Sequence, residues 1–570
     1  MVKRIISNNR NKAFARLIVV LLFLFMLNFV AQHFYKRFDL TSEKRYTLSS
    51  STKSLLGGLE DHVYVKIYLE GEFPAGFKRL QRATRELLDE FKAVSGARIE
   101  YQFIDPTAIE DMEERKKAYD FLVESGIKPT NLQVKGDEQF SQKVIFPGAL
   151  ISYRGKAAAV QLLENQIGYG PEQVLNNSIE LLEYKFANQI KKLIQRRSPK
   201  IGFTAGHGEA GETRLSDMIK TLQEQRYQVE MVDVTQQLSL VEKFNVLIIA
   251  QPKERFDEIE KYKIDQFIMH GGSVLWLIDP MVAHMDSLRN KNAYFAKPRN
   301  LNLEDQLFRY GVRLNNDLLQ DMRCGKIPLV VGSVGDAPQT QMFPWYYKTL
   351  VTGENLHPIS RNLDAVLFEF ASTIDTLKNE NIRKKILLNS SKYSKALMAP
   401  VRVHFSQVKL QPEPRAFPQS HLPLAVLLEG EFESVFKNRL TEKTQTLIDS
   451  IEGVEFKEKS DFNKMIVIGD GDIIQSQIGS RGNVYPLGFD VYTERTFANK
   501  DFLLNCIEYL LDENQLIDTR NKEVRLRLLD PQKVKSEKAY WQVLNLVLPI
   551  IIMLIFAVIY FFRRKRKYAA

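Results

Sequence analysis

The longest apolar runs of the chain stand near its two ends, at residues 17–34 and 543–562. Each has the length that a helix needs to cross a hydrocarbon core of about 30 Å. Pro549 in the second run is tolerated in such a helix, because neighbouring groups can satisfy the freed backbone. We therefore predict one transmembrane helix near each end.

A cleaved signal peptide is the alternative for the first run, since basic residues followed by an apolar core fit both. The bulky Phe29 stands near Ala31, where cleavage requires a second small residue. This favours an uncleaved anchor. If the run were cleaved, the C-terminal helix alone would hold the protein.

The Ser/Thr-rich strip after the first run, residues 35–59, offers helix-capping residues and ends in Gly57 and Gly58. It predicts a short helix near the membrane. From residue 60 to about 170, strand-like and helix-like patterns alternate and end in β-rich pieces. These patterns predict a first α/β domain, with strands at 62–71 and 97–106 and helices at 75–96 and 109–126. One long helix, 171–198, then leads onward.

Short, continuously apolar strands alternate with amphipathic helices after Pro199. This pattern is typical of a parallel sheet covered on both faces, in a flavodoxin-like or related doubly wound fold. The pattern loosens between about 303 and 494, and we expect the β-type run at 463–474 to return to the same sheet. The strands are predicted at 200–209, 227–234, 244–252 and 273–280, and the helices at 212–225 and 257–272.

The predicted fold class is thus α/β: an exported multidomain region with a doubly wound, mainly parallel sheet domain, flanked by one transmembrane helix at each end. The predicted segments are a basic tail (1–16), a transmembrane helix (17–34), a juxtamembrane strip (35–59), a first α/β domain (60–197), a doubly wound α/β domain with β-rich insertions (198–515), a connector (516–542), a transmembrane helix (543–562) and a second basic tail (563–570).

Charge sets the predicted orientation. Ten Lys and Arg residues flank the two apolar runs on their outer sides, with no acid among them. The positive-inside rule then places both termini in the cytoplasm and the large central part outside, which is periplasmic for a protein of the inner membrane. Without these ten, the 79 basic residues fall to 69 and equal the 69 acidic ones. A formally neutral central part argues against a nucleic-acid partner.

Two sequence features limit the chemistry. Cys324 and Cys506 are the only cysteines, too few for a disulfide framework or a zinc cluster, and the sequence leaves open whether they pair. The P-loop pattern G-x-x-x-x-G-K-[ST] does not occur, so ATP hydrolysis of that kind belongs to another protein. We predict no cofactor and no metal.

The candidate ligand-binding residues are His207, Glu209, Gln251 and Asp279. They follow three predicted strands, and ligands in open α/β sheets bind beyond the carboxyl ends of strands. His207 and Glu209 could form an acid/base pair, but the glycines around them also fit an ordinary tight turn. The paired acids in residues 469–472, Gly-Asp-Gly-Asp, fit a turn better than a calcium loop.

The order of these motifs resembles a known family. The strip RFDLTSEKRYTLSSST, the turn FTAGHGE, and LIIAQP leading to IDQFIMHGGSVLWLIDP are similar to GldG, the gliding-motility-associated ABC transporter component. The wider group is the auxiliary ABC-transporter proteins with an extracytoplasmic domain similar to those of intraflagellar-transport proteins. The resemblance covers residues 37–512 and implies a non-catalytic subunit that works with an ABC permease and a separate ATP-binding subunit in gliding motility or linked export.

Two other functions remain open at this point. One is a hydrolase or amidotransferase-like enzyme that uses His207 and Glu209. The other is a glycan- or peptide-binding module that uses the crevice near His207. The transporter-subunit hypothesis assigns the protein no catalytic residue. Its predicted partners are the lipid bilayer, the ABC permease and the separate ATP-binding subunit.

Overall fold

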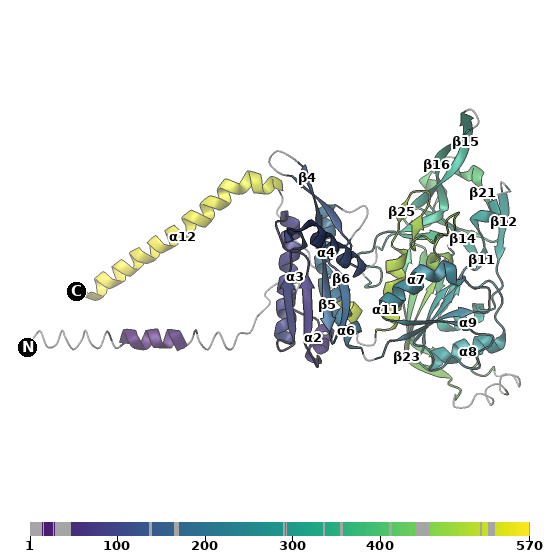
Figure 1. The fold of residues 1–570 in the computed structure, drawn as a ribbon, viewed down its shortest axis with the longest axis horizontal. Helices are drawn as coiled ribbons and strands as arrows, with labels where there is room; N and C mark the ends of the chain where they lie inside the picture. The colour runs from purple at the N-terminus through teal and green to yellow at the C-terminus, as the bar shows by residue number, and fades with distance from the viewer. Residues whose placement is uncertain are drawn as a thin grey trace, which may run out of the picture. The chain divides into compact units, whose positions relative to one another are not determined.

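A computed structural model of the full chain describes residues 14, 16–26, 28, 47–135, 140–164, 170–195, 197–288, 291, 293–334, 337–353, 357–409, 413–439, 446, 455–512, 516–521 and 531–568. The chain forms two compact units, Met1–Lys522 and Glu523–Ala570. The structure confirms a mixed α/β class with several separate sheets (Figure 1).

The first sheet has the strand order β2-β1-β5-β6. The central strand β1 pairs in parallel with β2 and antiparallel with β5, in register Val65↔Tyr101 and Val65↔Ile151. The predicted order of strands and helices is confirmed here. Its elements are α2 (Ser50–Gly57), β1 (Val63–Ile67), α3 (Ala75–Val94), β2 (Ile99–Phe103), η1 (Pro106–Ala108), α4 (Met112–Glu124), the hairpin β3 (Thr130–Lys135) and β4 (Phe140–Ile145), β5 (Gly148–Tyr153) and β6 (Lys156–Gln161).

The helix α2 forms because the Ser49 side chain caps it by accepting from the Thr52 amide. The predicted short helix is therefore present. Its Leu56 is fully buried in the core of the first sheet, together with Leu48 and Leu59. The described part of the strip thus packs as an integral piece of this sheet's core.

The predicted long helix at 171–198 is instead two helices, α5 (Pro171–Glu180) and α6 (Leu182–Ile194). The two helices meet at Leu181, whose side chain is buried. The helix α6 is buried on two faces: Phe186 and Ile190 join the core of the first sheet, and Tyr184 joins the core of the second. Sequence periodicity alone did not reveal this division.

The second sheet has the order β19-β22-β23-β10-β9-β7-β8. Five strands, from β23 to β8, run parallel, and β22 and β19 add antiparallel at one edge. The run predicted to return to this sheet does so as β23, which pairs with β10 in register Trp276↔Val467. The strands are β7 (Lys200–Ala205), β8 (Gln228–Asp233), β9 (Val246–Ala250), β10 (Ser273–Leu277), β19 (Ile382–Asn389), β22 (Pro423–Glu433) and β23 (Lys459–Ile468).

Both faces of this sheet are buried, as its continuous apolar strands require. Ile248 of β9 faces the core that α7 (Glu212–Glu224) and α11 (Asn499–Leu510) cover, whereas its neighbour Leu247 faces the core that α8 (Glu258–Met269) and α9 (Glu304–Tyr310) cover. Because these strands are parallel, their carboxyl ends lie at the same edge of the sheet. The candidate residues lie at that edge.

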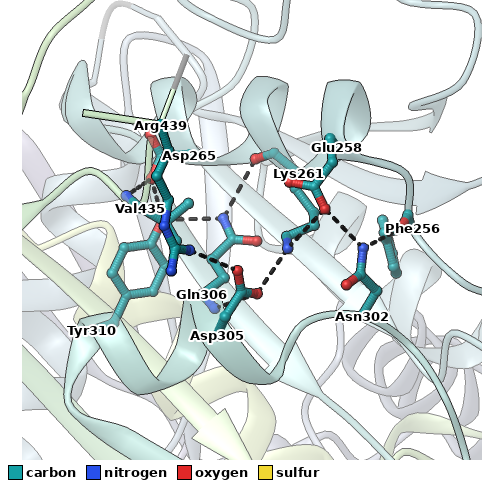
Figure 2. A network of polar contacts seen from close by, with 10 residues as sticks. All are labelled: Phe256, Glu258, Lys261, Asp265, Asn302, Asp305, Gln306, Tyr310, Val435 and Arg439. Carbon is teal, nitrogen blue, oxygen red and sulfur yellow. Dashed lines mark hydrogen bonds and ion pairs between the residues drawn. The ribbon is translucent and has the colours of Figure 1, made fainter. Parts of the chain in front are cut away.

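The helix α8 is buried along most of its length, including the charged residues Lys261, Lys263 and Asp265. A polar network satisfies these groups (Figure 2). The Lys261 ammonium lies 2.7 Å from Asp305 Oδ1, and Asp265 accepts from the Tyr310 hydroxyl at 2.8 Å and from the Val435 amide at 3.0 Å. Because every buried charge here has a partner, a helix without a clear polar face can still pack.

Smaller sheets fill the chain between β10 and α11. The longest of their strands, β15 (Cys324–Val334) and β16 (Ala337–Val351), form an antiparallel hairpin. The other strands are β11 (Met281–Val282), β12 (Ala293–Pro298), β13 (Val312–Leu314), β14 (Asp317–Asp321), β17 (Val366–Glu369), β18 (Ile374–Thr376), β20 (Ser394–Met398), β21 (Val401–His404), β24 (Phe489–Asp490) and β25 (Arg495–Thr496). Short 3-10 helices lie between them, η2 (Met285–Leu288), η3 (Phe405–Lys409), η4 (Pro414–Ala416) and η5 (Asp472–Ile474), and a further one, η6 (Leu516–Asn521), follows α11. Cys324 and Cys506 are both free thiols, so they do not pair.

The second unit contains the helix α12 (Pro531–Tyr568). Its segment Ser536–Arg566 is long and apolar enough to cross a membrane, and its apolar window is not buried against the protein. This supports the predicted C-terminal membrane anchor. Of the predicted N-terminal span, residues 17–26 and 28 are described, within or next to the shorter apolar helix Arg16–Met26, and the rest lies outside the described residues.

Candidate functional site: the carboxyl edge of the large sheet and the junction of the two sheets

His207 lies in the turn after β7, which the neighbouring glycines make possible. Gly206 and Gly208 have φ angles of +108° and +68°, and a Cβ on Gly206 would lie 2.7 Å from Asp233 Oδ1. The turn places the His207 ring against Phe256, with ring centroids 3.7 Å apart and planes 14° apart. His207 is only 2% exposed, so it is a packed residue.

Two carboxylates flank the His207 ring. Its Nε2 lies 2.9 Å from Glu260 Oε2, and its Nδ1 lies 3.7 Å from Glu209 Oε1. Burial alone lowers the pKa of His207, but the two carboxylates outweigh burial and raise it. Glu209 also accepts from the His207 amide at 2.6 Å, and these interactions hold the pKa of Glu209 low although burial opposes them. His207 and Glu209 thus lie next to each other in a buried turn, and their action as an acid/base pair stays a prediction.

Gln251 and Asp279 come together at the ends of β9 and β10, as their shared edge implied. Gln251 Nε2 donates to Asp279 Oδ2 and to Asp472 Oδ1, both at 2.7 Å. Gln475 Nε2 donates in turn to Asp472 Oδ1 at 3.0 Å. The Gly471 amide donates to Asp279 Oδ1. Among the residues that the structure describes, no side-chain hydrogen bond or ion pair joins this set to His207, so the four candidate residues fall into two groups of two.

Three carboxyl groups gather at this edge, from Asp279, Asp470 and Asp472, and we call them the acidic cluster. Asp470 is fully buried and accepts from the Glu369 amide at 2.7 Å and from the Asp472 amide at 2.8 Å. Burial, followed by the charge of the neighbouring aspartates, raises the pKa of Asp470 and of Asp472 well above the ordinary range. Burial also raises the pKa of Asp279.

Sequence reasoning did not connect Asp470 and Asp472 with Asp279. The Gly-Asp-Gly-Asp stretch was predicted to be a turn, and η5 begins there at Asp472. The missed signal was that the run at 463–474, once paired beside β10, must end at the same edge as Asp279. Glu260, which binds His207, was also missed because it lies in the first turn of α8.

The chemistry of this edge is limited by its hydrogen bonds. The carboxylates of the acidic cluster accept mainly from amides, and in the described part of the chain no three His, Cys, Asp or Glu side chains are arranged to hold a metal ion. Neighbouring carboxyl groups with raised pKa values can hold protons near neutral pH. Ligand binding by His207, Glu209, Gln251 and Asp279 stays a prediction.

A second polar group joins the two sheets, where α6 meets α11. Lys192 of α6 and Glu508 of α11 form a buried ion pair, with side chains 4% and 8% exposed. Glu508 also accepts from the Tyr184 hydroxyl and from Asn188 Nδ2, the latter at 3.1 Å. Although burial disfavours the charged carboxylate, Lys192 and these donors keep the pKa of Glu508 low.

The segment η6 sits at the same junction. Its Leu516 is buried in the core of the first sheet and the adjacent Ile517 in the core of the second. Asp512 binds Lys191 of α6 at 2.8 Å and accepts from the Ile517 amide at 2.8 Å. Arg520 is 5% exposed, donates to Asn505 Oδ1 and lies 5.3 Å above the Tyr184 ring. The last described residues before α12 are therefore fixed to both sheets.

Comparison with known protein families defines the class of this protein. The family described as an ABC-type uncharacterized transport system matches residues 198–506, more than half of the chain. A domain family of unknown function matches residues 42–152. The chain therefore belongs to the auxiliary-component family of ABC-type transport systems. Membership in this family implies a role in transport at a membrane and association with an ABC transporter complex.

Individual relatives add little on function. A protein of Borreliella burgdorferi, described only as uncharacterized, is 23% identical over 545 residues, which cover 93% of this chain and 94% of the relative. Among solved structures, the mmIFT52 N-terminal domain is 15% identical and is covered completely by 57% of this chain, with a TM-score of 0.32. The exo-beta-1,4-mannosidase Op5Man5 from Opitutaceae bacterium strain TAV5 is 10% identical over 68% of this chain and 48% of its own, with a TM-score of 0.19. These two likenesses are too weak to support an argument.

Proposed function

We propose that this protein is a non-catalytic, membrane-anchored subunit that couples an ABC transporter to an extracytoplasmic α/β module. In this proposal a separate permease spans the membrane and a separate ATP-binding subunit hydrolyses ATP. Two terminal transmembrane helices hold the module at the inner membrane, with both termini cytoplasmic and the module in the periplasm. We also propose that the large sheet forms a doubly wound domain and that the segments have the boundaries predicted above.

One observation carries the proposal: the segment that leads to α12 is built into the junction of the two sheets. Leu516 and Ile517 enter different cores, and Arg520 reaches Asn505 of α11. A membrane anchor that served only for attachment would not require such fixation. A displacement of η6 would instead be passed to both sheets together, because buried groups in contact move as a unit.

The particular process is proposed from the sequence motifs. They resemble GldG, so we propose gliding motility or linked export as the process that the transporter serves. The enzyme alternative gains no support from His207, which is buried and held by Glu260. The binding-module alternative would use Gln251 and Asp279 as ligand contacts.

The first experiment is affinity purification of the full chain in mild detergent, followed by mass spectrometry of the proteins that accompany it. We expect a multi-span permease and a P-loop ATPase in fixed ratio. If the chain is recovered alone in several detergents, the subunit proposal is wrong. Full function of a secreted version without both terminal helices would also contradict it.

The coupling step needs its own test, with Arg520→Ala compared with Arg82→Ala. Arg82 is an exposed residue of α3. We expect Arg520→Ala to keep the permease and the ATPase bound but to reduce transporter-dependent activity in cells, and Arg82→Ala to have no effect. Proteolysis checks whether Arg520→Ala releases η6 from the two sheets. If η6 is released and activity is unchanged, coupling is contradicted, but the proposal that the subunits assemble is not.

A further inference from the structure

A cavity of about 950 Å³ opens at the amino ends of the parallel strands, away from the acidic cluster. Lys200 at the start of β7, Ser273 at the start of β10 and Lys464 of β23 line it. Lys191 and Gln195, at the end of α6, close another side. We call this space the basal cavity. Its volume lies within the range that small-molecule sites occupy.

The basal cavity is strongly basic. Its lining contains five Lys or Arg residues and two acids, which gives a formal charge of +3. The chain between the two apolar runs is neutral on average, so this local excess is a feature of the fold and not of the composition. The five cations are Lys191, Arg197, Lys200, Lys243 and Lys464, and the two acids are Glu242 and Asp512.

Three of the five cations are engaged in the structure. Lys191 binds Asp512, Lys464 donates to the Asp512 carbonyl at 2.9 Å, and Lys243 donates to Gln237 Oε1 at 2.7 Å. Arg197 and Lys200 are exposed, and within the described ranges their side chains make no ion pair or hydrogen bond. Two cations therefore face the basal cavity with unused charge.

Helix ends do not account for Arg197 and Lys200. The helix α11 ends beside the basal cavity, and cations are favourable near the carbonyls of such an end. Lys464 already fills that role, because it donates to the carbonyls of Tyr509 and Asp512 at 3.3 and 2.9 Å. Arg197 and Lys200 have no such contact among the described residues, so their charge is available to an anion that enters the cavity.

We propose that the basal cavity binds a phosphate-bearing anion, either a soluble phosphate compound or the headgroup of an anionic lipid. Arginine presents a planar fork that matches phosphate oxygens, and lysine adds a point charge. The volume exceeds that of a bare ion, and Phe244, Phe267 and Phe462 supply apolar wall for the rest of a ligand. The inference is independent of the transporter proposal, because it rests only on the charges and the shape of this space.

The test uses the full chain in phosphatidylcholine nanodiscs and the double variant Arg197→Gln/Lys200→Gln. The matched control is Lys116→Gln/Lys117→Gln, which removes two exposed cations from α4. In one arm, inorganic phosphate and pyrophosphate are titrated by calorimetry at constant ionic strength. In the other, phosphatidylglycerol is added to the nanodiscs, and native mass spectrometry counts the lipid molecules that stay bound.

We expect the double variant to weaken binding by about tenfold or more, as the loss of two close charges implies, and the control to bind like the wild type. A loss in the titration arm identifies a soluble phosphate compound, and a loss only in the lipid arm identifies a headgroup. If the double variant and the control match the wild type in both arms, or if the wild type binds in neither, the proposal is wrong.

Discussion

Lys192 of α6 and Glu508 of α11 form a buried ion pair although 316 residues separate them in the sequence. Removing one partner of such a pair leaves an uncompensated charge in a low-dielectric site, which costs about 3–5 kcal/mol. We therefore expect Lys192→Met to lower the free energy of unfolding by that amount, measured by urea denaturation of the full chain in detergent.

The control for this prediction is Lys220→Met, whose ion pair with Glu224 is exposed. An exposed pair contributes about 1 kcal/mol or less. The double variant Lys192→Met/Glu508→Met should lose less stability than the sum of its single variants. Strict additivity of the two single effects would show that the pair is not coupled.

Asp472→Asn is expected to stabilise the protein at neutral pH. Asp472 Oδ1 accepts from Gln251 and Gln475, and an asparagine can keep both bonds while it removes one charge from the acidic cluster. Because the pKa of Asp472 is raised in the folded state, its contribution to stability is full below the unfolded value of 3.8 and is lost as pH rises through the folded value. Thermal unfolding between pH 4 and pH 8 should show a flatter profile for the variant.

The comparison variant for this pH profile is Asp461→Asn, an exposed acid on β23. It should leave the profile of the wild type unchanged. If Asp472→Asn lowers stability as much at pH 7 as at pH 4, ionisation of the acidic cluster does not cause the pH dependence of stability.

His207 predicts a pH dependence in a different window. Its folded pKa is raised, so its stabilising contribution is full below the unfolded value of 6.5 and is lost as pH rises through the folded value. We expect His207→Gln to remove this loss of stability above pH 6.5 in a series of urea titrations. His357→Gln is the control, because burial lowers the pKa of His357 to about 4 and its own change falls below pH 6.5.

Asp265 of α8 belongs to the polar network that Figure 2 shows. Its carboxylate accepts from Tyr310, Ser434 and Val435, and it is fully buried. Asp265→Ala leaves these donors unpaired, so we expect a loss of about 3 kcal/mol or more in the free energy of unfolding. Asp120→Ala, at an exposed position of α4, should change stability by about 0.5 kcal/mol or less. A comparable effect of both variants would argue against the network.

The local pattern of the chain was sufficient to predict most helices and strands. The apolar runs at 246–250 and 273–277 form the buried parallel strands β9 and β10, because a strand covered on both faces has no polar side. Capping by Ser49 and the glycines after β7 were also readable, since they act within a few residues. The membrane character of the C-terminal run follows from length and composition alone.

Only the tertiary structure decided which distant groups meet. Asp470 and Asp472 join Asp279 because β23 pairs beside β10, and Glu508 meets Lys192 because α11 packs against α6. Likewise, Lys243 and Lys464 line one cavity with Arg197 and Lys200 although the composition of the central part is neutral. Periodicity specifies the face that each element buries, whereas strand order and helix packing determine which buried or charged faces are brought together.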